Sequence, residues 1–192
     1  MIRVVQGDLA DATTDAVLRP ASAEWSAVTP AMRRLEIVAG PDVEAQCRRI
    51  GELPVGSAAI TTAGDLDAQF MVHVIVRSID EQVSEAIVRR ALQNGLRRLV
   101  EWGIGSVAIP PIGTGAGNLD PEDAATEMIP TIIEHMRTSQ YPSRVDLVVE
   151  SDYEKDAFDR VLRTFELPIL SDGEQTDPVF FVAAPPDSDQ VR

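Results

Sequence analysis

A glycine-rich segment is the strongest candidate for ligand chemistry in this sequence. It lies three residues after the apolar run 106–109 and precedes an expected helix start at Asp120. Glycines at alternate positions let a backbone turn several N–H groups towards one centre, as an anion-binding loop requires. The segment has no lysine after its glycines, so it is not a P-loop, and its spacing differs from GxGxxG. The alternative is a strand-to-helix turn that binds nothing. The segment consists of Gly113, Thr114, Gly115, Ala116 and Gly117.

Asp8 is a second candidate, and it follows Gly7 at the end of the apolar run 2–6. A carboxylate at the end of a strand can accept a hydrogen bond from an exocyclic amine, such as that of adenine. It can equally cap the short segment that follows it. Taken alone, the residue favours the capping interpretation.

Residue types that are common in catalysis are few and scattered. Cys47 has no histidine near it in sequence, which favours a buried structural thiol. His73 lies inside the apolar run 70–76, as a core histidine with satisfied nitrogens would, and His135 is expected on a helix surface. The single cysteine excludes an intrachain disulfide, and the lack of a Cys/His cluster excludes a structural zinc site. We therefore predict no catalytic residue, no metal and no cofactor.

Short apolar runs alternate with amphipathic stretches along the chain, which predicts an α/β sandwich with parallel pairing at its centre. The runs are too short for buried helices, and several are bounded by glycine or proline. Strands are expected at 2–6, 16–18, 56–62, 70–76, 106–109 and 145–149.

Helix signals lie between these runs. Thr29-Pro30 has the form of an N-cap followed by proline at the first helical position, and Gly40-Pro41 should end that helix. A second short helix is expected over 42–50, and Pro130 should kink the helix that begins near Asp120. Two pairs have capping-box spacing: Ser78 with Glu81, at the start of a long helix ending near Gly103, and Ser151 with Glu154.

Composition and charge narrow the function. The 192 residues suit one domain, and 44% hydrophobic but only 5% aromatic residues predict an aliphatic core. With 17 basic and 31 acidic side chains, the net charge of −14 disfavours nucleic acid as a partner. We expect no signal peptide, no membrane contact and a cytoplasmic location. The domain should span 1–166. The acidic, proline-containing segment 167–192 is expected to be a tail, partly disordered or docked through 179–182.

Five segments together resemble the macro domain family, in order and in spacing. They are Val5-Gln6-Gly7-Asp8-Leu9, Asp15-Ala16-Val17-Leu18, Val55 to Thr62, Phe70-Met71-Val72-His73 and Ile109 to Gly117. The resemblance covers about residues 2–165. It implies a three-layer α/β/α sandwich with a mixed sheet of about six strands, and ADP-ribose lying across the strand ends.

The resemblance also implies roles for particular residues. Asp8 would contact the adenine amine, and Leu9 would help through its backbone. The segment 113–117 would wrap the diphosphate with backbone N–H groups. The expected partner is ADP-ribose or a related small nucleotide, free or carried as ADP-ribosylated protein.

The sequence departs from the family pattern around the distal ribose. The family's Asn-Ala-Ala-Asn falls on 19–22, so Ser22 replaces the asparagine that serves that ribose and hydrolysis. The first glycine-rich loop falls on 27–30, which contains no glycine. The acidic residue of hydrolytic members falls on Met32, and an aromatic that often stacks on adenine falls near Glu150.

Three hypotheses follow. The favoured one is a binding module for ADP-ribose or a related nucleotide without hydrolase activity. The second is an ADP-ribosyl hydrolase or an enzyme that processes ADP-ribose phosphate. The third is an interaction domain whose pocket has closed. Under the first hypothesis, 27–30 should form no open glycine cradle, and Pro30 should begin a helix.

Overall fold

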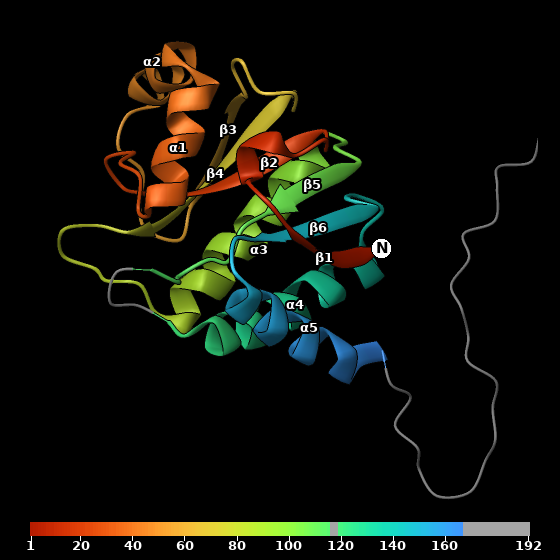
Figure 1. Ribbon diagram of the computed structural model, residues 1–192. Helices are drawn as coiled ribbons and strands as arrows, with labels where there is room; N and C mark the ends of the chain where they lie inside the picture. The colour runs from red at the N-terminus through yellow and green to blue at the C-terminus, as the bar shows by residue number, and fades with distance from the viewer. Residues whose placement is uncertain (116–118, 167–192) are drawn as a thin grey trace, which may run out of the picture.

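The computed structural model describes residues 1–115 and 119–166, which fold around a six-stranded sheet (Figure 1). The strands are β1 (Ile2–Gln6), β2 (Ala16–Ser22), β3 (Ala58–Thr62), β4 (Phe70–Arg77), β5 (Ser106–Ile109) and β6 (Arg144–Val149). The helices are η1 (Leu9–Asp11, 3-10), α1 (Pro30–Ala39), α2 (Pro41–Ile50), α3 (Glu85–Glu101), α4 (Pro121–Thr138) and α5 (Asp152–Glu166).

The sheet is mixed, with the strand order β1-β6-β5-β2-β4-β3. Neighbouring strands from β1 to β4 in this order run parallel, and only β3 pairs antiparallel, with β4. The carboxyl ends of five parallel strands therefore lie at one edge of the sheet. Loops that leave this edge are well placed to share one ligand.

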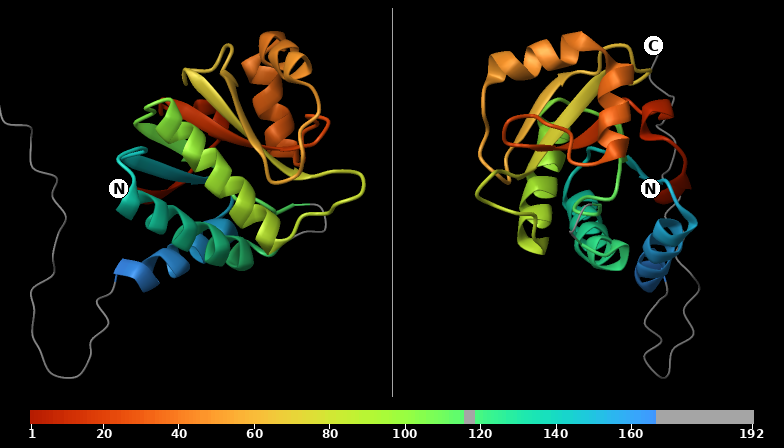
Figure 2. Two further views of the ribbon diagram at one scale, coloured as in Figure 1. Left: turned by 180° about the vertical axis from the view of Figure 1, so that it is seen from behind. Right: turned by 60° about the vertical axis from the view of Figure 1, so that its left-hand side comes forward.

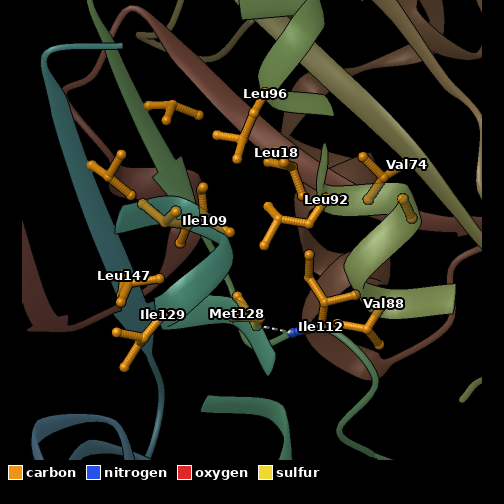
Figure 3. Packing of buried hydrophobic residues seen from close by; sticks show 14 of the residues in the cluster. Leu18, Val74, Val88, Leu92, Leu96, Ile109, Ile112, Met128, Ile129 and Leu147 are labelled. Carbon is orange, nitrogen blue, oxygen red and sulfur yellow. Dashed lines mark hydrogen bonds between the residues drawn. The ribbon is translucent and has the colours of Figure 1, made fainter. Parts of the chain in front are cut away.

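Helices cover both faces of the sheet, which confirms the three-layer α/β/α sandwich (Figure 2). One buried cluster joins α1 and α2 to the sheet through aliphatic residues such as Leu35 and Met71. A larger cluster joins α3, α4 and α5 to the opposite face, and Leu92, Leu96 and Met128 lie within it (Figure 3). Both clusters are mainly aliphatic, as the composition predicted.

Strand β2 is longer than its apolar run of 16–18 predicted. It pairs with β4 from Ala16 to Ser22, but with β5 only at Ala16 and Val17. Beyond Val17 the strand no longer pairs with β5, and Ala21 bridges Ala27 of the following segment instead. Proline is tolerated where a strand lacks a paired neighbour on one side, so Pro20 can continue β2. The sheet thus splits between β2 and β5 near its carboxyl edge.

Most predicted helix starts are confirmed, and one is wrong. Thr29 caps α1, and Asp120 caps α4, which continues through Pro130. Ser78 does not begin α3: its Oγ accepts a hydrogen bond from the Glu81 N–H at 3.1 Å, and its N–H donates to the Glu81 carbonyl at 2.9 Å. These two bonds close a turn rather than open a helix. The cap of α3 is Ser84.

The remaining start, at α5, forms as predicted. Glu154 Oε2 accepts from the Ser151 N–H at 3.3 Å, and Ser151 Oγ accepts from the Glu154 N–H at 3.2 Å.

The prediction of a tail over 167–192 lies outside the described residues, as do the predicted ligand contacts of Ala116 and Gly117. No helix in the described part of the chain is long and apolar enough to cross a membrane.

Candidate functional site: a cleft at the carboxyl ends of the parallel strands

A cavity of about 200 Å³ lies at the carboxyl edge of the sheet, where β2 and β5 separate. Every parallel strand contributes to it through its last residues or the loop that follows. The contributors are Gly7 after β1, Pro20 in β2, Val76 in β4, 110–111 and 113–115 after β5, and Glu150 after β6. This is the place where ligands bind in open α/β sheets.

The loop after β5 is anchored in the apolar core. Ile112 is fully buried, and its backbone N–H donates to the Met128 Sδ at 3.2 Å (Figure 3). Gly113 and Gly115 have φ angles of +90° and +105°, a region that side chains disfavour. A Cβ atom at Gly113 would lie 3.0–3.2 Å from three side chains, those of Val88, Leu119 and Val83. Both its backbone angles and its surroundings therefore favour glycine at position 113.

The segment 27–30 faces this loop across the cleft. Thr29 Oγ1 accepts a hydrogen bond from the Met32 N–H at 3.2 Å, and Pro30 is the first residue of α1. The prediction that Pro30 begins a helix is confirmed. The Thr29 methyl group, Cγ2, lies 3.0 Å from the position that a Cβ atom on Gly115 would occupy. The two loops are therefore in close contact.

A second, more open hollow of about 750 Å³ lies between the 24–30 segment, α1 and α2. Thr29 and Pro30 line this hollow as well as the first cavity, so they form the wall between the two. Arg19 and Cys47 lie in its floor, and neither lines the cavity at the strand ends.

The Arg19 guanidinium connects β2 to the loop that follows it and to α1. Its side chain is only 3% exposed and forms an ion pair with Glu36 of α1. Nη2 also donates to the Trp25 carbonyl at 2.6 Å, and Nη1 lies 3.0 Å from His73 Nδ1. Arg19 is thus directed away from the strand-end cavity, and it ties the 22–26 turn to α1.

His73 is fully buried on the β4 strand and is satisfied at both nitrogens. Arg19 can only donate, so His73 Nδ1 must accept and Nε2 carries the proton. Nε2 lies 2.9 Å from Thr61 Oγ1, which donates in turn to the Thr62 carbonyl. Burial, together with the Arg19 charge, lowers the pKa of His73 well below its usual value. The imidazole is neutral, as predicted for a core histidine.

Cys47 is buried against this cluster, with Sγ 3.8 Å from His73 Nε2. Burial raises the pKa of its thiol to about 11, although the nearby Arg19 opposes the shift. A thiol with this pKa is protonated at neutral pH and is a poor nucleophile. The prediction of a buried thiol is confirmed.

Ser22 lies near the cavity but does not line it. Its Oγ accepts a hydrogen bond from the Ser26 N–H at 3.1 Å, and its carbonyl accepts from Trp25 N–H at 2.9 Å. Both groups serve the turn that follows β2. The predicted ligand contact of Ser22 stays a prediction, and its hydroxyl has a structural partner already.

Asp8 lies at the rim of the cleft, between Gly7 and Leu9, which do line it. Its Oδ1 accepts from the Ala10 N–H at 2.9 Å, so the capping interpretation is correct. Its Oδ2 lies 3.4 Å from Nε of Arg34, which also pairs with Glu150. Sequence reasoning missed Arg34, because its two partners come from distant parts of the chain.

The cavity is largely apolar and carries no positive side chain among its described lining residues. Its charged members are Glu150 and Glu154. The Glu154 carboxylate accepts from the Glu150 N–H at 2.9 Å. An anionic ligand would therefore depend on backbone N–H groups rather than on side-chain cations. Within the described residues, no group of three metal-ligating side chains comes together.

A glycine loop where the parallel strands β2 and β5 separate places a cleft at the strand ends, as in ligand-binding α/β proteins. The macro domain model matches residues 31–128. A macro domain-containing protein of Streptomyces coelicolor is 34% identical over 142 residues, which cover 68% of this chain and 82% of that protein. The chain belongs to the macro domain family.

Two further proteins resemble it. The O-acetyl-ADP-ribose deacetylase of Escherichia coli is 29% identical over 167 residues, which cover 84% of this chain and 94% of the relative. The Oceanobacillus iheyensis macrodomain with ADP superposes with a TM-score of 0.75 at 20% identity. That match covers 85% of this chain and 90% of the other, and it supports the fold.

Proposed function

We propose that this chain is a binding module for ADP-ribose or a related adenine nucleotide and does not hydrolyse it. One observation carries the proposal: a core-anchored glycine loop with two positive φ angles faces a cleft where five parallel strands end. Such a loop can hold a diphosphate through its backbone, without cationic side chains. The ADP of the solved macrodomain and the name of the Escherichia coli relative both support an ADP-containing ligand.

In this proposal, backbone N–H groups of 113–117 hold the diphosphate. Gly113, Thr114 and Gly115 line the cleft in the described part of that loop. Leu9 lies at the adenine end and Asp8 at its rim, where one carboxylate oxygen faces Arg34 at 3.4 Å. That long contact is between half-exposed groups and is weak. An adenine amine can replace Arg34 there at little cost.

The proposal that the chain does not hydrolyse its ligand rests on what surrounds the far end of the cleft. Met32 supplies a buried thioether, Pro30 has no N–H, and the Ser22 hydroxyl serves a turn. The two carboxylates that line the cavity, Glu150 and Glu154, follow β6. Glu150 pairs with Arg34 at the Asp8 rim, where adenine is proposed to bind, and Glu154 bonds the backbone beside it. Neither is therefore placed to activate water at a distal ribose.

A second candidate function is deacetylation or hydrolysis of an ADP-ribose derivative, and the Escherichia coli relative favours it. Two experiments distinguish these functions. Isothermal titration with ADP-ribose and with ADP measures binding, and incubation with O-acetyl-ADP-ribose or ADP-ribosylated protein measures turnover. We expect binding of at least one nucleotide and turnover at the buffer rate. Turnover well above buffer would favour the enzyme, and no binding of either nucleotide would refute the proposal.

The ligand can arrive free or attached to a protein, and ADP-ribosylated protein remains part of the proposal. Nucleic acid is disfavoured by the net charge of −14, because phosphate backbones would be repelled at long range. Binding through directional backbone hydrogen bonds should depend only weakly on salt, in contrast to nucleic-acid binding.

A further inference from the structure

We propose that Thr29 limits the length of the ligand, so that the cleft prefers an adenine nucleotide ending at its diphosphate over one that carries a second ribose. The inference rests on the proposed function, since it assumes that the diphosphate lies against 113–115. It concerns what can be attached beyond that diphosphate.

The contact between the two loops sets the limit. Thr29 Cγ2 lies 3.0 Å from where a Cβ on Gly115 would be, so the methyl group packs directly on the loop backbone. The methyl cannot rotate away freely, because Oγ1 of the same residue accepts the hydrogen bond from Met32 N–H. Rotation about χ1 would break the cap of α1. The capping bond thus holds the methyl group in place over Gly115.

The space left on the β5 side of this contact is small. The cavity measures about 200 Å³, so a nucleotide whose adenine and diphosphate occupy it leaves little room for a second ribose. Its wall near Thr29 consists of Val28, Pro30, Ala31 and Met32. A ribose placed there would bury hydroxyl groups against side chains that offer them no hydrogen-bond partner, which is unfavourable.

Two polar side chains of β2, Arg19 and Ser22, cannot supply the hydrogen bonds that such a ribose would lack. Arg19 directs its guanidinium to Glu36, Trp25 and His73, on the other side of the wall. Ser22 uses its hydroxyl to accept from Ser26 N–H. The second hollow, where the Arg19 guanidinium lies, is separated from the cleft by Thr29 and Pro30. A ligand would have to displace this wall to reach it.

Two substitutions at one position separate a length limit from a purely structural role. Thr29→Gly removes the methyl group and still suits an N-cap, so it should lower the melting temperature only slightly. Thr29→Val keeps the methyl group and loses the capping oxygen, so it should lower the melting temperature more. If Thr29 limits the length of the ligand, the change in ligand preference should be larger for Thr29→Gly than for Thr29→Val. Only Thr29→Gly opens the wall.

The test is isothermal titration of the full chain and both variants with ADP and with ADP-ribose. We expect the parent chain to bind ADP more tightly than ADP-ribose, and Thr29→Val to keep that preference. Thr29→Gly should shift the ratio of the two dissociation constants towards ADP-ribose by roughly tenfold, the effect of relieving one or two methyl-sized clashes.

The outcomes are distinguishable. Tighter binding of ADP-ribose by the parent chain, or the same ratio in parent and Thr29→Gly, would overturn the length limit and leave the proposed function standing. A larger shift in Thr29→Val than in Thr29→Gly would show that Thr29 acts only as a cap, which also overturns it. If no variant binds either nucleotide, the proposed function fails, and the length limit fails with it.

Discussion

Loop 110–115 and the 22–29 segment meet across the cleft, and they are held in place by different forces. The first is anchored by aliphatic packing around Ile112 and by glycines whose neighbours leave little room for a Cβ atom. The second is held by a buried ion pair and hydrogen bonds that centre on Arg19. The first loop offers backbone to the cleft, while the second offers side chains.

Because of this difference, a substitution on one side of the cleft can leave the other side intact. Apolar anchoring is insensitive to charge and pH, so loop 110–115 keeps its shape independently of the residues opposite. A buried charge needs its partners, because removing one leaves the other uncompensated. The 22–29 segment therefore depends on Glu36 and His73, and predictions that alter these residues should affect one loop and spare the other.

The largest expected effect comes from breaking the glycine loop. Gly115→Val places a β-branched side chain at φ +105° and against Thr29. Backbone strain of this kind costs about 1–3 kcal/mol of stability, and the side chain blocks the diphosphate position, so nucleotide binding should be lost in a titration. Gly103→Val is the matched control: φ is +63°, and no atom lies near its Cβ position. It should lose stability but bind as the parent does. Unchanged binding by Gly115→Val would mean that the loop is only a turn.

Removing the counter-ion of Arg19 should destabilise the opposite side of the cleft. Glu36→Gln leaves a 3%-exposed guanidinium without its carboxylate, and the cost should lie near the lower end of about 3–5 kcal/mol because Glu36 is 22% exposed. Glu44→Gln breaks the exposed pair with Arg48 and should cost at most about 1 kcal/mol. Urea denaturation measures both. Equal effects would show that the Arg19 pair contributes no more than a surface pair.

Lowering the pH should reduce the stability of the folded chain through His73, which contacts Arg19 beside the 22–29 segment. Its pKa is lowered in the folded state, so the unfolded chain binds a proton first as the pH falls below about 6.5. The stability from neutral His73 is therefore complete above that pH and is lost below it, by up to about 1.4 kcal/mol per pH unit. His73→Gln keeps an acceptor for Arg19 and a donor for Thr61 without titrating. The gap in stability between parent and variant should narrow from pH 7 to pH 5.5; a constant gap would contradict this assignment.

The smallest effect concerns Cys47. A pKa raised to about 11 means that the folded thiol ionises less than the unfolded one, so its contribution to stability is full below about pH 9 and is lost as the pH rises towards 11. At pH 8, iodoacetamide should modify the native thiol on the order of 100-fold more slowly than the thiol in urea. Equal rates would place Cys47 in an exposed or activated environment instead.

Features that depend on local sequence were predictable. The Thr29 cap, the run 106–109 and the Ser151/Glu154 box all form as expected, because their signals lie within a few residues. The predicted helix start at Ser78 was wrong because Ser-x-x-Glu spacing also fits a closed turn. The extent of β2 was missed because Arg19 and Pro20 are unusual in a strand, and only the pairing with β4 explains them.

The candidate site was predictable only in part. The glycine loop carries its own signal, and its place at the end of a buried strand pointed to the cleft. The Thr29–Gly115 contact and the Arg34 pairs with Asp8 and Glu150 join residues far apart in the chain. Neither has a local pattern. Arg19 likewise gathers its partners from α1, β4 and the turn after β2, which no periodicity encodes.

A crystal structure of the full chain with ADP would test the central claim most directly, namely that backbone on one side binds and side chains on the other side close the cleft. We expect a diphosphate against the backbone of 113–115, with Thr29 still packed on Gly115 and the Arg19–Glu36 pair unchanged. A nucleotide bound in the hollow beside Arg19, or one that displaces Thr29 and runs through the wall, would contradict it.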